Sequence, residues 1–126
     1  MNEHEEKMIS VFIAKEKRHR FRYFMDNIKT RPGELDCLNH TRVLNPRYTT
    51  WLSGKEDIVQ LLRNEGCPEN VYIISMEERI DKKTLPLSEA IAQVFEYNWG
   101  TIVSCIPGKL AYYHDEDGKR RALLKA

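Results

Sequence analysis

Three short segments rich in β-branched and aromatic residues constrain the fold more than any other feature of the chain. They cover residues 71–75, 101–106 and 110–114, and turn residues bound each of them. Such runs are typical of buried strands. Between the first two segments, apolar side chains recur at helical spacing, namely Leu87, Ile91, Val94 and Phe95. This half of the chain therefore predicts a small sheet with a helix packed against it.

Turn residues organise the C-terminal end of the chain. Pro107 and Gly108 have the order of a type II turn, with proline at the second position and glycine at the third. Asp117 and Gly118 form the strongest hairpin signal in the sequence. We therefore expect residues 119–125 to supply a fourth strand, at the edge of the sheet, where their basic side chains discourage pairing with another molecule.

The first half of the chain is predicted to be mostly helical. In two long segments and one short segment, apolar side chains recur three or four residues apart, as in amphipathic helices. A fourth helix is predicted from residues that cap its two ends. Ser53 and Glu56 have capping-box spacing before it, and Gly66 is a fitting residue to end it. The predicted helices are 3–15, 16–29, 34–41 and 54–65.

These elements predict an α+β fold within one domain over residues 1–126. The helical part covers about 1–66 and the sheet part about 67–126, in the order N-terminal helices and then α-β-α-β-β-β. A strand, a helix and a strand invite a parallel crossover, so we expect a small mixed sheet of three to four strands. Helices packed on one face of that sheet are the simplest arrangement. The stretch 48–52 is expected to be irregular, with two large aromatic side chains.

Composition narrows the environment and the classes of partner. The formal net charge is +1 over 126 residues, so overall charge selects no partner. Three widely spaced cysteines do not suit a disulfide-stapled secreted domain. The first residues are acidic rather than basic, and no apolar run reaches the roughly 20 residues of a membrane span. We therefore expect a soluble, cytoplasmic protein that does not enter a membrane.

A basic segment is the strongest local charge feature. Residues 15–31 carry seven Lys or Arg side chains and two acidic ones. Within it, cations alternate with aromatic rings, a pattern that suits phosphate contacts and base stacking. The same pattern also describes a solvated helix face whose aromatic rings point into the core. If the segment binds nucleic acid, the predicted contacts are Lys17, Arg18, Arg20 and Arg22.

Cysteine and histidine offer two weaker chemical patterns. Cys37 and His40 have the C-x-x-H spacing of half a zinc site, but no second close pair completes it. Cys105, late in a predicted strand, would need His114 or His40 as a base to act as a nucleophile. No glycine-rich phosphate loop occurs in the sequence. We therefore predict no metal site, no cofactor and no catalytic residue.

Aromatic residues gather near the predicted turn at Pro107. Neighbouring strand residues point to opposite faces, so Tyr112 or Tyr113 faces away from the helices if only one sheet face is covered. With Trp99, these side chains form a predicted interaction surface. We expect a non-enzymatic protein-interaction or regulatory module that binds a protein or self-associates. Two alternatives stay open: a nucleic-acid-binding domain using residues 15–31, and a small cysteine-dependent enzyme.

Overall fold

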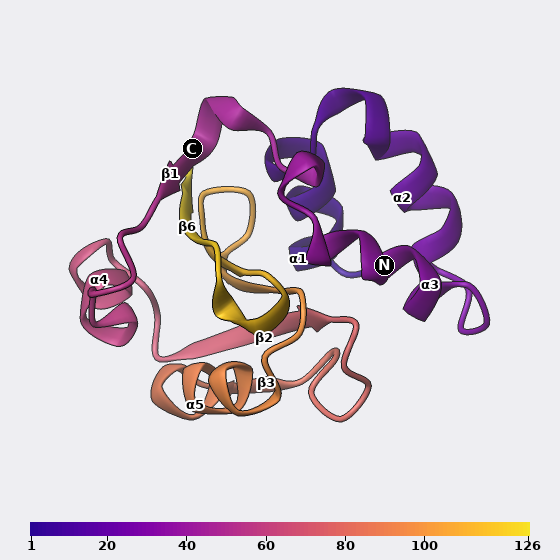
Figure 1. The fold of residues 1–126 in the computed structure, drawn as a ribbon. Coiled ribbons are helices and arrows are strands. Elements are labelled where there is room, and N and C mark those ends of the chain that lie inside the picture. The colour runs from indigo at the N-terminus through magenta and orange to yellow at the C-terminus, as the bar shows by residue number, and fades with distance from the viewer.

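The computed structural model describes residues 1–126 and contains one open sheet of six antiparallel strands (Figure 1). The strands are β1 (Thr49–Trp51), β2 (Asn70–Ser75), β3 (Thr84–Pro86), β4 (Thr101–Ile106), β5 (Leu110–His114) and β6 (Arg121–Lys125). The α-helices are α1 (Glu3–Lys7), α2 (Arg18–Met25), α3 (Arg31–Leu35), α4 (Ile58–Asn64) and α5 (Leu87–Tyr97). The strand order is β1-β6-β5-β4-β2-β3. The α+β class and the helical N-terminal half are therefore confirmed.

The predicted mixed sheet of three to four strands is wrong in both number and direction. The segment after β2 folds back as β3, which pairs antiparallel with β2. The chain thus enters α5 already reversed, and β4 returns antiparallel to β2, with Ile73 opposite Val103. The other missed strand, β1, pairs outside β6, with Thr50 opposite Leu123. Strand β6 was predicted correctly but is not an edge strand, because β1 covers it.

Helices cover both faces of the sheet, not one as predicted. In Figure 1 the indigo and violet helices α1, α2 and α3 lie on one side of the strands, and α5 lies on the other. One apolar cluster packs side chains of the first helices, such as Phe12, against Tyr113 and Ile74. A second cluster packs α4 and α5 against the opposite side of the strands, including Tyr112. The central strands are apolar on both faces, and burying both faces requires a layer on each.

The ends of the second-half helices follow their sequence signals. Gly66 and Asn98 end α4 and α5 with φ of +90° and +55°, in the left-handed region that glycine and asparagine tolerate. The start of α4 differs, because Asp57 caps it by accepting from the amide of Gln60 at 3.1 Å. The predicted Ser53 and Glu56 contact does form, in the loop that precedes the helix.

The N-terminal helices are shorter than the predicted ranges. Helix α1 runs on into one π-helical turn, Met8–Phe12, and the chain then becomes extended at Ile13. Ile13 bridges to Leu44 as an isolated antiparallel pair. Pro32 lies in the first turn of α3, where a proline needs no amide partner. The proline is therefore compatible with the start of the third helix, which begins at Arg31.

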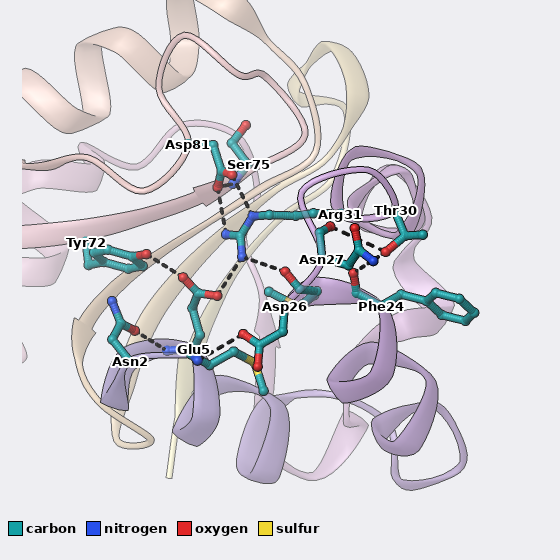
Figure 2. Close-up of polar contacts among 12 residues, drawn as sticks. Asn2, Glu5, Phe24, Asp26, Asn27, Thr30, Arg31, Tyr72, Ser75 and Asp81 are labelled. Atoms are coloured by element: carbon teal, nitrogen blue, oxygen red, sulfur yellow. Dashed lines mark hydrogen bonds and ion pairs between the residues drawn. The ribbon is translucent and has the colours of Figure 1, made fainter.

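A buried polar network joins the N-terminal helices to the sheet. Figure 2 shows the Arg31 guanidinium between the carboxylates of Glu5 and Asp81, at 2.6 and 2.7 Å. The Tyr72 hydroxyl donates to Glu5, and the Ser75 amide donates to Asp81 at 3.0 Å. Every charge in this group has a partner of opposite sign or a donor. We therefore assign the network to the attachment of α1 and α3, not to a binding site.

Candidate functional site

Two adjoining hollows form one groove on the side of the sheet that carries the N-terminal helices. Their volumes are about 730 and 590 Å³, each within the range of ligand sites. They share the walls made by Lys17, Thr41 and Arg42. We call this feature the groove. The remaining members of its lining are Ala14, Lys15, Glu16, Cys37, Asn39, His40, Val43, Leu44, Asn45, Pro46, Thr49, Trp51, Asp115 and Arg120.

Backbone pairing between distant segments builds the first wall of the groove. The Ala14 amide donates to the Val43 carbonyl, and the Asn45 amide donates to the Phe12 carbonyl, both at 2.7 Å. These bonds flank the bridge between Ile13 and Leu44. The turn at residues 15–17 is thereby held beside the turn at 41–43. Two basic segments that lie 24 residues or more apart in sequence thus line one hollow.

Strand β1 and the β5–β6 loop supply the second wall. Trp51 pairs with Ala122 across the strands, which places the indole beside Arg120. The Arg120 guanidinium lies over the indole ring, 4.3 Å from its centroid. Arg120 is itself held by a hydrogen bond from its amide to the Asp115 carboxylate at 2.8 Å. Trp51 keeps 41% of its surface exposed, although Arg120 lies over its ring and Tyr113 packs against it at a steep angle.

The groove carries a surplus of unpaired positive charge. Four cations line it, Lys15, Lys17, Arg42 and Arg120, against the two carboxylates Glu16 and Asp115. None of the four cations makes an ion pair within the protein. The Asp115 carboxylate accepts from a backbone amide instead of a side-chain cation. The cations are therefore free to bind an anionic ligand.

Only one of the four predicted nucleic-acid contacts lines this groove. Lys17 does, whereas Arg18 turns back to donate to the Ile13 carbonyl at 3.0 Å. Arg20 pairs with Glu34, and Arg22 pairs with Glu6, at 3.1 and 2.9 Å. These three arginines secure α2 to its neighbours. The basic segment is therefore divided, and its end at Lys15 and Lys17 is the part that faces the groove.

The predicted aromatic interaction surface is not formed by its two tyrosines. Tyr112 and Tyr113 are each 0% exposed, because a helical layer covers each face of the sheet. The prediction that one of them faces solvent is wrong. Trp99 keeps 38% of its surface exposed and is the member of the set that reaches the surface.

The structure separates Cys105 from both histidines proposed as its partner. His114 pairs with Thr101, and Cys105 lies four residues further along β4, a separation of about 13 Å. His40 lines the groove on the other side of the sheet, together with Cys37. The structure contains no group of three or more His, Cys, Asp or Glu side chains that could hold a metal ion. Neither the thiol–histidine pair nor the zinc pattern has its partners.

His114 forms a buried hydrogen-bonded chain instead. It is 0% exposed, its Nδ1 lies 2.9 Å from the Tyr112 hydroxyl, and its Nε2 lies 2.8 Å from Asn98 Oδ1. Burial, with a smaller effect of the Arg121 guanidinium, lowers the pKa of His114 to about 4. The ring is therefore neutral at physiological pH and acts as a structural link.

Comparison of the chain with protein-family models, with curated proteins and with solved structures finds no match. No helix is long and apolar enough to cross a bilayer. The candidate site therefore stands on its own geometry: an open groove with unpaired cations on both walls and one accessible indole.

Local sequence does not mark Trp51, Arg42 or Arg120 as site residues. Trp51 lies in a stretch that the sequence predicts to be irregular. Arg120 lies in the basic run 119–121, a pattern that is typical of a protected sheet edge. These residues stand out only because they surround one groove. They reach the groove through pairing between segments that are far apart in sequence.

Proposed function

We propose that the protein binds single-stranded nucleic acid in the groove. The observation that carries this proposal is the gathering of four unpaired cations and a half-exposed indole from four separate segments. The cations lie on both sides of the groove, so a chain of phosphates running along it meets positive charge throughout. The basic segment 15–31 also predicted nucleic-acid binding. In the groove, however, most of the proposed contacts come from residues outside α2.

The charge of the groove favours a polyanion over a neutral ligand. Each lysine or arginine that neutralises a phosphate releases a condensed counterion, and this release supplies most of the affinity of sequence-independent binding. Arg42 and Arg120 are exposed, and guanidinium groups present several donors to phosphate oxygens. The two acidic side chains of the lining leave a net charge of +2, which favours modest, salt-sensitive binding.

The indole favours an unpaired strand over a duplex. Base stacking on an aromatic ring needs the flat face of the base, which pairing and stacking cover in a duplex. Because the Arg120 guanidinium lies over one face of the Trp51 ring, a base would stack on the part of the ring that Arg120 leaves open, and its phosphate would meet the guanidinium. One aromatic platform with flanking cations is the arrangement that sequence-tolerant single-strand binders use.

The other expectation, a protein-interaction module, has less support from side-chain placement. The sheet face that motivated it is covered, and Trp99 is the part of that surface left exposed. A protein ligand for the groove would need to be acidic, because the groove carries a surplus of positive charge. Competition between an acidic peptide and an oligonucleotide therefore distinguishes the two kinds of ligand.

Fluorescence anisotropy with labelled single strands tests the proposal. The wild-type protein is titrated into oligomers of DNA and of RNA at low salt, with a duplex of the same sequence beside them. We expect dissociation constants of about 10⁻⁶ to 10⁻⁴ M for single strands at physiological salt, with tighter binding at low salt and weaker binding to the duplex. The triple variant Lys17→Ala, Arg42→Ala and Arg120→Ala should bind at least about ten-fold more weakly, since it loses three phosphate contacts.

A matched variant separates groove contacts from overall charge. Lys29, Lys83 and Lys109 are exposed, make no ion pair and do not line the groove. Replacing these three with alanine removes the same charge and should leave binding within about two-fold. Equal weakening in both triple variants, or no binding by the wild type at low salt, would refute the groove as a nucleic-acid site. Preference for the acidic peptide would indicate a protein ligand instead.

Trp51 and Trp99 provide a second matched pair, because both indoles are partly exposed and only Trp51 lines the groove. Trp51→Ala should weaken single-strand binding by about five-fold or more, the effect of losing one stacked base. Trp99→Ala should leave it unchanged. An equal response of both variants would contradict the role of Trp51 as a stacking platform.

A further inference from the structure

Two of the three cysteines pack in one apolar cluster, on the face of the sheet opposite the groove. Cys105 lies on β4 and is 2% exposed, inside the apolar cluster that packs against α4 and α5. It occupies the point where the β4–β5 register shifts, between Ser104 and Ile106. Cys67 follows α4 and packs against the same cluster. Both thiols are free, and Cys67 is partly exposed.

The end of α4 fixes the position of Cys67. The Gly66 amide donates to the Arg63 carbonyl and the Cys67 amide donates to the Leu62 carbonyl, both at 3.0 Å. With Gly66 at φ +90°, these two bonds make a Schellman motif, which turns the side chain after the glycine back toward the helix. Leu62 is fully buried in the cluster that holds Cys105. The motif therefore packs Cys67 against the cluster that contains Cys105, and the Cys67 thiol donates to the Pro68 carbonyl at 3.2 Å.

The two thiols perturb each other in opposite directions. Interaction with the Cys105 thiol lowers the pKa of Cys67 despite partial burial, and the Arg63 guanidinium lowers it further. The same interaction, together with burial, raises the pKa of Cys105. Cys67 is thus the thiol that ionises first. It also lines an open cleft of about 560 Å³ with Arg63 and Ser88, which a small oxidant can enter.

We propose that Cys67 and Cys105 are a peroxide-oxidisable dithiol, with Cys67 the attacking thiol and Cys105 the resolving thiol. The Cys67 thiolate attacks one oxygen of hydrogen peroxide, the O–O bond breaks, and Cys67 becomes a sulfenic acid while the departing hydroxide takes up a proton. The Cys105 sulfur then attacks the Cys67 sulfur. The S–O bond breaks, the Cys105 proton leaves with the hydroxyl group as water, and a disulfide forms. Two thiols and one peroxide thus give one disulfide and two waters.

Mass spectrometry of the oxidised full chain tests this inference. The folded protein is treated with an equimolar amount of hydrogen peroxide, then denatured and alkylated. The expected product has lost two hydrogen atoms and accepts one alkyl group, at Cys37. Trypsin should release residues 64–79 joined to residues 84–109, the peptides that contain Cys67 and Cys105. An unchanged mass, a link through Cys37, or a disulfide between two molecules would each overturn the proposal.

Single serine variants distinguish the two roles. Cys37→Ser should form the disulfide as the wild type does, and Cys67→Ser should form none. Cys105→Ser should stop at the first step and leave Cys67 as a sulfenic acid, which dimedone traps. Dimedone trapping at Cys67 that is equally strong in the wild type would show that Cys105 does not resolve it. Because the wild-type mass is decisive alone, poor folding of a variant does not obscure the result.

Discussion

Acidification should destabilise this protein through one buried side chain, His114. Asn98 Oδ1 accepts from Nε2 of His114, so the neutral ring carries its proton there and Nδ1 accepts from the Tyr112 hydroxyl. A second proton on Nδ1 would oppose that hydroxyl proton and place a charge in a site that is 0% exposed. The neighbouring Arg121 guanidinium adds repulsion. The folded protein therefore resists protonation of His114.

The size of the effect follows from the change in pKa. Burial lowers the pKa of His114 from 6.5 to about 4, and each unit corresponds to about 1.36 kcal/mol. The unfolded chain binds the extra proton first, so the free energy of unfolding is unaffected well above pH 6.5. It then falls as the pH is lowered from about 6.5 toward 4, by about 3 kcal/mol in total.

Urea unfolding of the wild type and of His114→Gln between about pH 7 and pH 4 measures this contribution. The wild type should lose about 3 kcal/mol more than the variant over that range. His4, whose pKa burial also lowers, is present in both proteins and cancels in the difference. NMR titration of the folded wild type gives an independent reading, with an expected His114 midpoint near 4. A midpoint near 6.5, or equal pH dependence of both proteins, would refute the reasoning.

Two substitutions test the packing of the N-terminal layer. Arg31→Ala leaves Glu5 and Asp81 buried without their cation. In urea titrations it should lower the free energy of unfolding by about 3–5 kcal/mol. A loss below about 1 kcal/mol would contradict the role of the network in attaching α1 and α3. Gly100→Ala would place its Cβ 2.5 Å from the Leu38 carbonyl carbon and should cost about 1–3 kcal/mol by the same assay, whereas an unchanged stability would show that this contact relaxes freely.

Local signals were sufficient for the central strands and the longest helix. The β-branched runs of β2 and β4 and the helical spacing within α5 are continuous in the sequence, so neighbouring residues alone specify them. The two missed strands, β1 and β3, are three residues long each. A run that short carries no periodic pattern. Their pairing partners, such as Leu123 for Thr50, cannot be recognised from local sequence.

The sequence does contain a signal for the covered second face of the sheet. Tyr112 and Tyr113 are adjacent, so they point to opposite faces, and large apolar side chains on both faces are typical of a sheet that is buried on both sides.

Of the cations in the candidate site, Lys17 is predicted from the basic segment in which it lies. Arg42 and Arg120 join it only through the Ile13–Leu44 bridge and the pairing of β1 with β6, which no local pattern predicts.

The salt dependence of single-strand binding tests the central claim most directly. Four phosphate contacts, at about 0.7 each for a single strand, give a slope of about −2.8 for the logarithm of affinity against the logarithm of salt concentration. The wild type should therefore bind about 50-fold more weakly when salt rises four-fold, from about 50 to about 200 mM. In the variant lacking Lys17, Arg42 and Arg120, the slope should shrink to about −0.7. A wild-type slope near zero, or the same slope in both proteins, would contradict phosphate binding in the groove.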